Sequence, residues 1–213
     1  MKMNPINVDG VLLTFQPGWK VLKIDEAAWY RDGDAIGNQV KAMDVTAFGP
    51  SGHWWIEVKN CHGHEVANRP RLTPSDPKPT ELTDTEKWIV ERGWDQLVEV
   101  KRKKLFVVDE VVQKVAGTIA SLAAAERAPL KELRATSVKP YAQGYMPGKQ
   151  LTVVLLLTWS LPDFAVLASR LKTRMEQRLR AFDVTCFVVN ETVSAPAQPW
   201  AAERIAPDSD PSA

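Results

Sequence analysis

The stretch of sequence that decides the fold is residues 39–61, QVKAMDVTAFGPSGHWWIEVKNC. Two strand-like runs, residues 39–48 and 53–61, flank the turn-forming residues 49–52, GPSG. Glycine and proline supply the dihedral angles of a tight turn, and the flanking runs are rich in strand-forming residues. The stretch therefore predicts a β-hairpin with a four-residue loop.

A loop of this length fixes the register, because Phe48 then faces His53 across the two strands. One face becomes apolar and predicts the core side: Ala47 opposes Trp54, Val45 opposes Ile56, and Met43 opposes Val58. The other face pairs Thr46 with Trp55, Asp44 with Glu57, and Ala42 with Lys59. The register thus predicts that two acidic side chains meet on one face of the hairpin.

This pairing has a chemical consequence. Side chains directly opposed on two strands have Cβ atoms about 4.5–5.5 Å apart, and like charges there destabilise a sheet. Asp44 and Glu57 therefore need a shared cation, or one of them must take up a proton. Clustered carboxylates suit Mg²⁺, and Lys59 on the same face can assist a phosphate or an attacking water. The alternative is a solvated face on which Glu57 and Lys59 pair with neighbours, although Trp55 on that face argues against full solvation.

Residues 43–60, MDVTAFGPSGHWWIEVKN, resemble the PD-(D/E)XK nuclease superfamily, which has the restriction-endonuclease-like fold. The family pattern is an acid near the end of one strand and acid-x-Lys on the next, here Asp44 and then Glu57-Val58-Lys59. The resemblance implies that Asp44 and Glu57 bind Mg²⁺, for which Mn²⁺ can substitute, and that Lys59 assists hydrolysis. One departure is Met43, which stands where the family often has proline.

The resemblance also implies residues outside the hairpin. Such proteins often add an acid from the preceding helix, and Asp25 and Glu26 are placed for this; we favour Glu26 as a catalytic and metal-binding residue. Polar residues on the helix after the signature match Gln113 and Lys114, which we expect to bind nucleic acid. The family's roles are DNA cleavage, repair and defence against foreign DNA, so DNA is the expected substrate ahead of RNA.

The rest of the chain predicts the fold class. Residues 151–159, LTVVLLLTW, are typical of a central strand buried on both faces, and a helix with an apolar stripe follows a capping-box pattern at residues 160–163. We expect strands in residues 11–24 and 183–190, a short helix at 25–31, helices within 84–104 and 109–127, a loop over 62–82, and a turn-rich connector over 140–148. The predicted class is α/β, a restriction-endonuclease-like mixed central sheet with helices on both faces.

We expect one nuclease-like domain over residues 1–191. Residues 192–213 are rich in alanine, proline and serine and predict a disordered tail, apart from a docking contact by Trp200. The stripe of the long helix is predicted to be buried at Phe164, Leu167, Leu171, Met175, Leu179 and Phe182. Trp88, Leu97 and Val98 are predicted to be buried in the preceding helical region.

Composition limits the partners. The net charge is +1, so nucleic-acid binding needs a local patch, and the densest basic run comprises Lys101, Arg102, Lys103 and Lys104. A second basic side lies on the later helix at Arg170, Lys172, Arg174, Arg178 and Arg180. Both runs are equally typical of solvated helix faces. Two cysteines without a spaced framework favour a reduced, cytoplasmic setting, and no apolar run approaches the roughly 20 residues of a membrane span.

The segment Cys61-His62-Gly63-His64 suggests zinc, but a second ligand pair at zinc-finger spacing is absent from the sequence. The alternative places these residues in a loop near the catalytic mouth, where His62 or His64 contacts phosphate.

The sequence therefore predicts a Mg²⁺-dependent endonuclease acting on nucleic acid. The rival interpretation is a non-catalytic nucleic-acid-binding or scaffold subunit with the same fold. A third is a defence effector whose nuclease depends on an activating partner protein or on homo-oligomer formation.

Overall fold

The computed structural model describes residues 5–32, 36–73, 80–98, 100, 105–129, 131–145 and 148–205. Its centre is a mixed five-stranded sheet. In spatial order the strands are β3 (Lys20–Leu22), β4 (Val45–Gly49), β5 (Gly52–Lys59), β6 (Leu151–Leu157) and β7 (Val184–Val189). The pairs β3–β4 and β4–β5 are antiparallel, whereas the pairs β5–β6 and β6–β7 are parallel. The predicted α/β class with a mixed central sheet is confirmed at this level.

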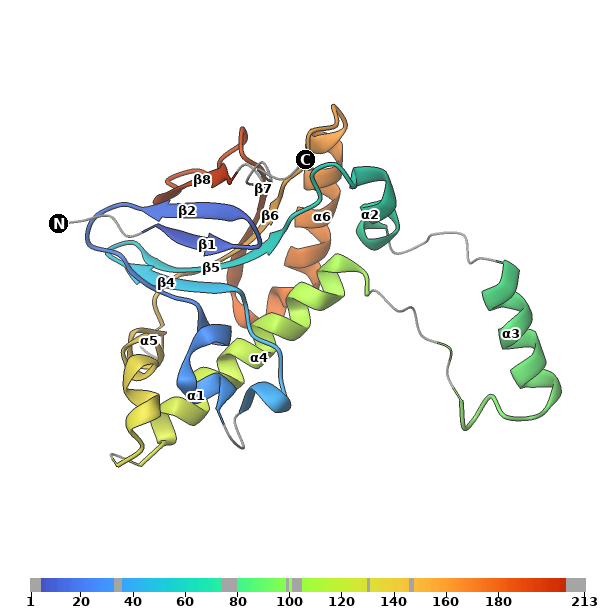
Figure 1. The fold of residues 1–213 in the computed structure, drawn as a ribbon, viewed down its shortest axis with the longest axis horizontal. Coiled ribbons are helices and arrows are strands. Elements are labelled where there is room, and N and C mark those ends of the chain that lie inside the picture. Colours follow the sequence, from blue (N-terminus) through green and yellow to red (C-terminus); the bar gives the residue numbers. More distant parts are fainter. Residues whose placement is uncertain are drawn as a thin grey trace, which may run out of the picture.

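A second, antiparallel sheet covers one face of the first (Figure 1). It consists of β1 (Ile6–Val8), β2 (Val11–Phe15) and β8 (Trp200–Arg204) in the order β1-β2-β8. Its apolar residues share a core with Val45, Ile56 and Val154 of the central sheet. The prediction of helices on both faces is therefore wrong for this face, because a sheet buries it.

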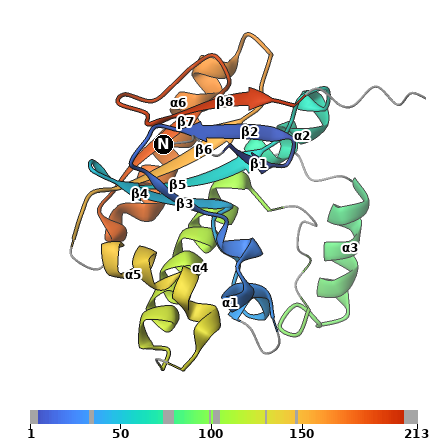
Figure 2. The same ribbon diagram turned by 60° about the vertical axis from the view of Figure 1, so that its left-hand side comes forward.

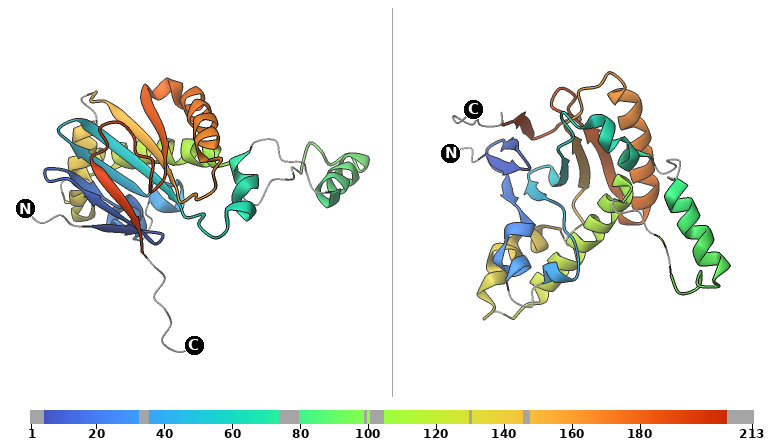
Figure 3. Two further views of the ribbon diagram at one scale, coloured as in Figure 1. Left: turned by 90° about the horizontal axis from the view of Figure 1, so that it is seen from above. Right: turned by 45° about the vertical axis from the view of Figure 1, so that its right-hand side comes forward.

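Most of the described helices cover the opposite face, as the views in Figures 2 and 3 show. The α-helices are α1 (Ala28–Arg31), α2 (Glu65–Leu72), α3 (Thr80–Glu91), α4 (Val107–Arg127), α5 (Lys139–Tyr145) and α6 (Phe164–Leu179). Short 3-10 turns occur at η1 (Ile24–Glu26), η2 (Ile36–Asn38), η3 (Leu133–Ser137) and η4 (Arg180–Phe182). Residues from α4, α5 and α6 pack against Trp55, Val153 and Leu155 to form the larger core.

The predicted hairpin is confirmed with its register, but the predicted four-residue loop is wrong, because Gly49 and Gly52 also pair and only Pro50 and Ser51 lie between the strands. Phe48 pairs with His53, Ala47 with Trp54, Thr46 with Trp55, and Val45 with Ile56. The ladder stops there, because β4 begins at Val45. Met43, predicted to share a face with Val58, instead packs in the helix-side core, so the alternation of the strand does not extend to it.

The central strand and the helix after it also agree with the sequence. Every residue of β6 is buried, with neighbours on both sides in the sheet. The stripe of α6 is buried from Phe164 to Leu179, and Phe182 is partly buried against the same core. The capping box is wrong, however: Asp163 makes no side-chain cap, and Ser160 donates to Glu65 instead.

Several segments predicted as irregular form regular structure. The predicted loop over 62–82 contains α2, which includes Pro70, and the start of α3. The predicted connector over 140–148 contains most of α5. In the predicted tail, β8 pairs with β2, and Trp200 is buried as the docking contact required. Residues 206–213 of that tail lie outside the described residues.

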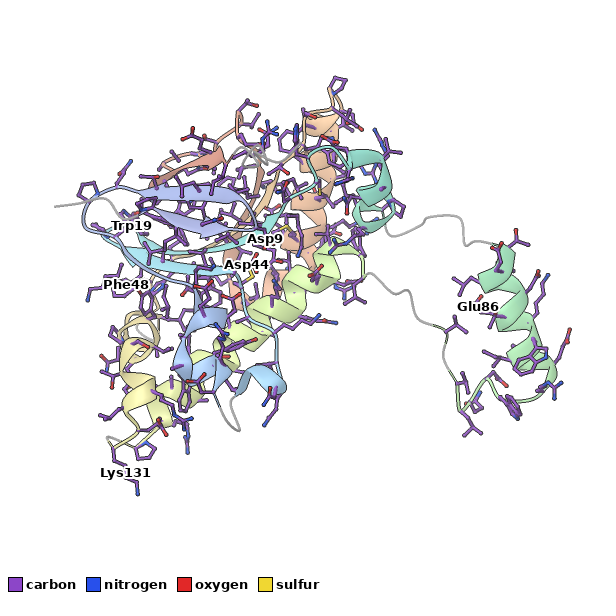
Figure 4. The ribbon with its side chains drawn as sticks, viewed as in Figure 1. Asp9, Trp19, Asp44, Phe48, Glu86 and Lys131 are labelled. Atoms are coloured by element: carbon purple, nitrogen blue, oxygen red, sulfur yellow. The ribbon has the colours of Figure 1, made fainter. Side chains whose placement is uncertain are left out.

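Helix α3 lies apart from the body of the molecule in Figure 1, and Figure 4 shows Glu86 on it, far from Asp44. The predicted burial of Trp88, Leu97 and Val98 is wrong, since all three side chains are exposed. Trp88 instead packs edge to face with Trp94. Within the described residues, every helix is too short or too polar to cross a bilayer.

Candidate active site

The hairpin and helix α4 together hold the Asp44 carboxylate. Asp44 directly precedes β4 and is almost completely buried between the sheet and α4 (Figure 4). Its Oδ2 accepts a hydrogen bond from the backbone N–H of Val58 at 2.8 Å, across the hairpin. The preceding backbone N–H, that of Met43, donates to Thr118 Oγ1 of α4 at 2.9 Å. These bonds fix the carboxylate toward the helix layer.

The carboxylates of Glu57 and Asp44 both bind one atom, the Nζ of Lys114. Glu57 is completely buried in β5, which lies between β4 and β6. Lys114 Nζ lies 2.7 Å from Asp44 Oδ1 and 2.7 and 2.8 Å from the two carboxylate oxygens of Glu57. The predicted convergence of the two acids is thus confirmed, and the cation between them in this structure is an ammonium.

This position corrects the expected role of Lys114. We predicted that it would contact nucleic acid, but its side chain is only 13% exposed and points into the carboxylate pair. Helix α4 presents Glu110 on the same face one turn earlier, as i,i+4 spacing requires. Lys114 is therefore part of the site itself.

Lys59 extends the cluster toward the surface. Its Nζ lies 2.5 Å from Glu57 Oε1 and 2.9 Å from Glu110 Oε1, and its side chain is 15% exposed. Arg71 of α2 binds the other Glu110 oxygen, Oε2, through Nη2 at 2.7 Å. Acidic and basic groups therefore alternate in one network: Asp44, Lys114, Glu57, Lys59, Glu110 and Arg71.

The network sets unusual proton affinities. Burial, and then the charge of Asp44, raises the pKa of Glu57 to about 7 in spite of two neighbouring lysines. Burial alone would lower the pKa of Lys114, but the carboxylates of Glu57 and Asp44 outweigh it and raise this pKa. The same balance, with Glu57 as the main partner, raises the pKa of Lys59. Both lysines are therefore cationic, whereas Glu57 gains or loses its proton near neutral pH.

Asp25 is the acid of the 3-10 turn η1 that senses the charge of Asp44. Burial, and then the charge of Asp44, raises the pKa of Asp25, although the residue is exposed at the surface. Glu26, which we had favoured, pairs with Lys23 and is 56% exposed. The role of Glu26 as a catalytic and metal-binding residue stays a prediction.

Of the other predicted nucleic-acid contacts that the structure describes, Gln113 does not join this cluster. Gln113 is exposed on α4 and lines a surface pocket with Lys41 and Gly117. The basic run Lys101, Arg102, Lys103 and Lys104 lies outside the described residues. Of the second basic side, Arg178 pairs with Asp109 and Lys172 pairs with Glu176.

Glu110 and Arg71 are the site residues that sequence reasoning missed. Glu110 stands four residues before Lys114, a spacing that could have placed both on one helix face. Arg71 gave no signal, because its segment was predicted to be a loop. Within the described parts of the chain, no group of three or more histidine, cysteine, aspartate or glutamate residues gathers closely enough to hold a metal by itself.

Comparison of the chain with protein-family models, with curated proteins and with solved structures finds no match.

Proposed function

We propose that this chain is a divalent-metal-dependent nuclease that hydrolyses phosphodiester bonds, with DNA the preferred substrate. The observation that carries the proposal is the convergence of Asp44 and Glu57 on one cation position, 2.7 Å from each, with Lys59 beside Glu57. The strand order also supports it, since an antiparallel hairpin is followed by helix α4 and a parallel strand β6. This is the arrangement in which the restriction-endonuclease-like resemblance would place its signature residues.

The donor set fits a divalent cation. Oxygens from two carboxylates already lie within hydrogen-bond distance of one atom, and hard cations such as Mg²⁺ and Mn²⁺ prefer oxygen ligands. The Lys114 ammonium and a metal ion need the same carboxylate oxygens. Asp44 and Glu57 would therefore hold the metal once the ammonium withdraws. A metal held there supplies Lewis-acid polarisation of the phosphate and a more acidic bound water.

The protein's own residues have separable tasks. Lys59 is anchored by Glu57 and Glu110 and carries a fixed positive charge at the edge of the pair, where a phosphate oxygen can be neutralised. Lys114 keeps the two carboxylates together when no metal is bound. The raised pKa of Glu57 means that a proton competes with any metal below about pH 7.

The test is cleavage of plasmid DNA and of single-stranded RNA with Mg²⁺, with Mn²⁺ and with a chelator. We expect metal-dependent cutting by the parent and a loss of about 100-fold or more in Glu57→Gln and Lys59→Ala. The matched control is Glu65→Gln, which removes a buried acid bonded to Ser160 outside the site. A folded parent that cuts neither substrate with either metal would refute the nuclease proposal.

One observation favours the rival role of a non-catalytic binding subunit. Lys114 satisfies both carboxylates by itself, so the cluster can serve as a structural ion-pair network. Buried networks of this kind exist to fix a particular packing as well as to perform chemistry. Nucleic-acid binding by the parent that survives Glu57→Gln, without cutting under any metal condition, would support this second role.

A further inference from the structure

A pocket of about 500 Å³ opens where β5 ends, next to the ion-pair network. It is lined by Asp9, Lys59, Asn60, His62, His64 and Arg71. Lys59 thus belongs both to the carboxylate cluster and to this pocket. A group bound in the pocket would lie beside the proposed reaction centre.

The lining is suited to an anion. Lys59 and Arg71 are cationic, and the exposed rings of His62 and His64 can donate hydrogen bonds. The one acidic side chain in the lining is that of Asp9, whose backbone carbonyl accepts a bond from Asn60 at 2.9 Å. A second acid, Glu65, lies just outside the lining, with its Oε1 3.9 Å from Nδ1 of His62. The same oxygen accepts a hydrogen bond from the hydroxyl of Ser160.

Arg71 has a donor to spare. Its Nη2 binds Glu110, whereas its Nε–H is buried and has no hydrogen-bond partner among the described residues. An unpaired buried donor is costly, and the planar fork of arginine suits a phosphate or a carboxylate; because this Nε–H is closed to solvent, the side chain has to turn to present it to the pocket. Lys59 and Arg71 already hold the two oxygens of one carboxylate, that of Glu110, so the pair is arranged around an anion.

We propose that this pocket binds a backbone phosphate of the nucleic acid, adjacent to the phosphodiester held at the carboxylate pair. The inference rests on the proposed function and gives that site a second point of substrate contact. Lys59 connects the two positions, because it touches Glu57 on one side and lines the pocket on the other. Helix α2, through Arg71, then determines the path along which the nucleic-acid strand enters the site.

The three histidines of the chain provide a direct readout. His62 and His64 line the pocket, whereas His53 is buried and lies next to Phe48 and Tyr145. Imidazole NMR signals, assigned with His62→Ala and His64→Ala, are followed with a chelator present. Inorganic phosphate is titrated first and then a short single-stranded DNA. Both probes should shift the His62 and His64 signals and leave His53 unchanged.

Two arginines on α2 make a matched pair of variants. Arg71→Gln removes a pocket charge, and Arg69→Gln removes one that faces Asp163 and Trp159 instead. We expect Arg71→Gln to weaken the binding of both probes about tenfold or more, and Arg69→Gln to leave it unchanged. Arg71→Gln should also lower the slope of log affinity against log salt by about 0.7, the value for one phosphate contact to a single strand. Because Arg71 also binds Glu110, the exposed His64→Ala serves as a second variant that leaves the network intact and should weaken binding as well.

The outcomes separate this inference from the proposed function. Histidine signals that respond to neither probe overturn the inference, and plasmid cutting by the same parent would leave the nuclease proposal standing. Signals that respond to inorganic phosphate but not to DNA also overturn it, because the pocket would then take free phosphate. Equal weakening by Arg69→Gln and Arg71→Gln overturns it too. Shifts with both probes in a parent that never cuts support the pocket and refute the catalysis.

Discussion

Lys114 donates to both carboxylate oxygens of Glu57, at 2.7 and 2.8 Å. The same ammonium reaches Asp44, so one amino group bridges two opposed acids. It also occupies the position that a divalent cation would need. In the proposed nuclease this side chain closes the resting site, and a metal would have to replace it.

This replacement predicts the behaviour of Lys114→Met. Without metal, Asp44 would lose the ammonium that pairs with it and Glu57 would keep only Lys59, so the free energy of unfolding should fall by about 3 kcal/mol. Mg²⁺ or Mn²⁺ should restore the loss, so the rise in Tm on adding metal should be larger than in the parent. Thermal denaturation with and without metal measures both effects, and Lys172→Met, at an exposed pair with Glu176, is the control. A variant as stable as the parent without metal and indifferent to it would contradict the prediction.

The pKa of Glu57 predicts a pH dependence with a definite sign. In the folded state it is about 7 against an ordinary 4.5, so between these values the folded chain keeps a proton that the unfolded chain has lost. The free energy of unfolding should therefore fall as pH rises through this window, by roughly 3 kcal/mol, and level off above pH 7. Glu57→Gln should abolish this fall in chemical denaturation measured across the window.

Glu65→Gln is the control for this titration. The hydrogen bond from Ser160 lowers the pKa of Glu65, so its contribution to stability is lost only as pH falls below the ordinary value. The slope between 4.5 and 7 should therefore be unchanged in Glu65→Gln. An identical slope in the parent and in Glu57→Gln would show that Glu57 does not titrate there.

We predict that alanine in place of Gly117, inside helix α4, lowers the free energy of unfolding. A Cβ at this position would lie 1.9 Å from the backbone oxygen of Lys41, so α4 can approach the segment before β4 only with glycine there. Alanine normally stabilises a helix interior by about 1 kcal/mol relative to glycine. Gly117→Ala should instead destabilise by about 2 kcal/mol and displace Lys114, one turn away. A stabilised variant in chemical denaturation would show that the contact is not made.

We predict that the segment after residue 192 stabilises the core through the side chain of Trp200. It is 5% exposed, pairs with Phe15 of β2 and joins the core beneath the small sheet. Trp200→Ala should cost about 3–5 kcal/mol in the free energy of unfolding. Glu203→Ala, an exposed residue of the same strand, should change stability little. Similar melting of both variants and the parent would mean that β8 is not docked in solution.

The sequence predicted what depends on local geometry. The loop at residues 49–52 determined the pairing from Val45 to Ile56, and the two acids met as that register required. The extrapolation failed just beyond the ladder, at Met43, because the chain leaves the strand conformation there to bond with Thr118. Side chains alternate between the two faces of a sheet only where the backbone is hydrogen-bonded as a strand.

The rest of the site comes from elements far away along the chain. Lys114 and Glu110 arrive on α4 and Arg71 on α2, and their positions depend on packing that no local pattern expresses. Asp25 and Glu26 are neighbours in one 3-10 turn, and a local sequence pattern does not choose between them. Helix α2 was hidden by Pro70, since proline usually interrupts helices.

The pairing of β2 with β8 joins the two ends of the described chain. During synthesis on a ribosome, the hairpin and β6 can assemble long before β8 emerges, and until then β2 keeps an unpaired edge and the core around Trp200 stays open. Such surfaces make nascent proteins prone to aggregate and dependent on chaperones. We therefore expect that messages truncated before residue 200 yield insoluble product, although every residue of the carboxylate cluster has already been translated.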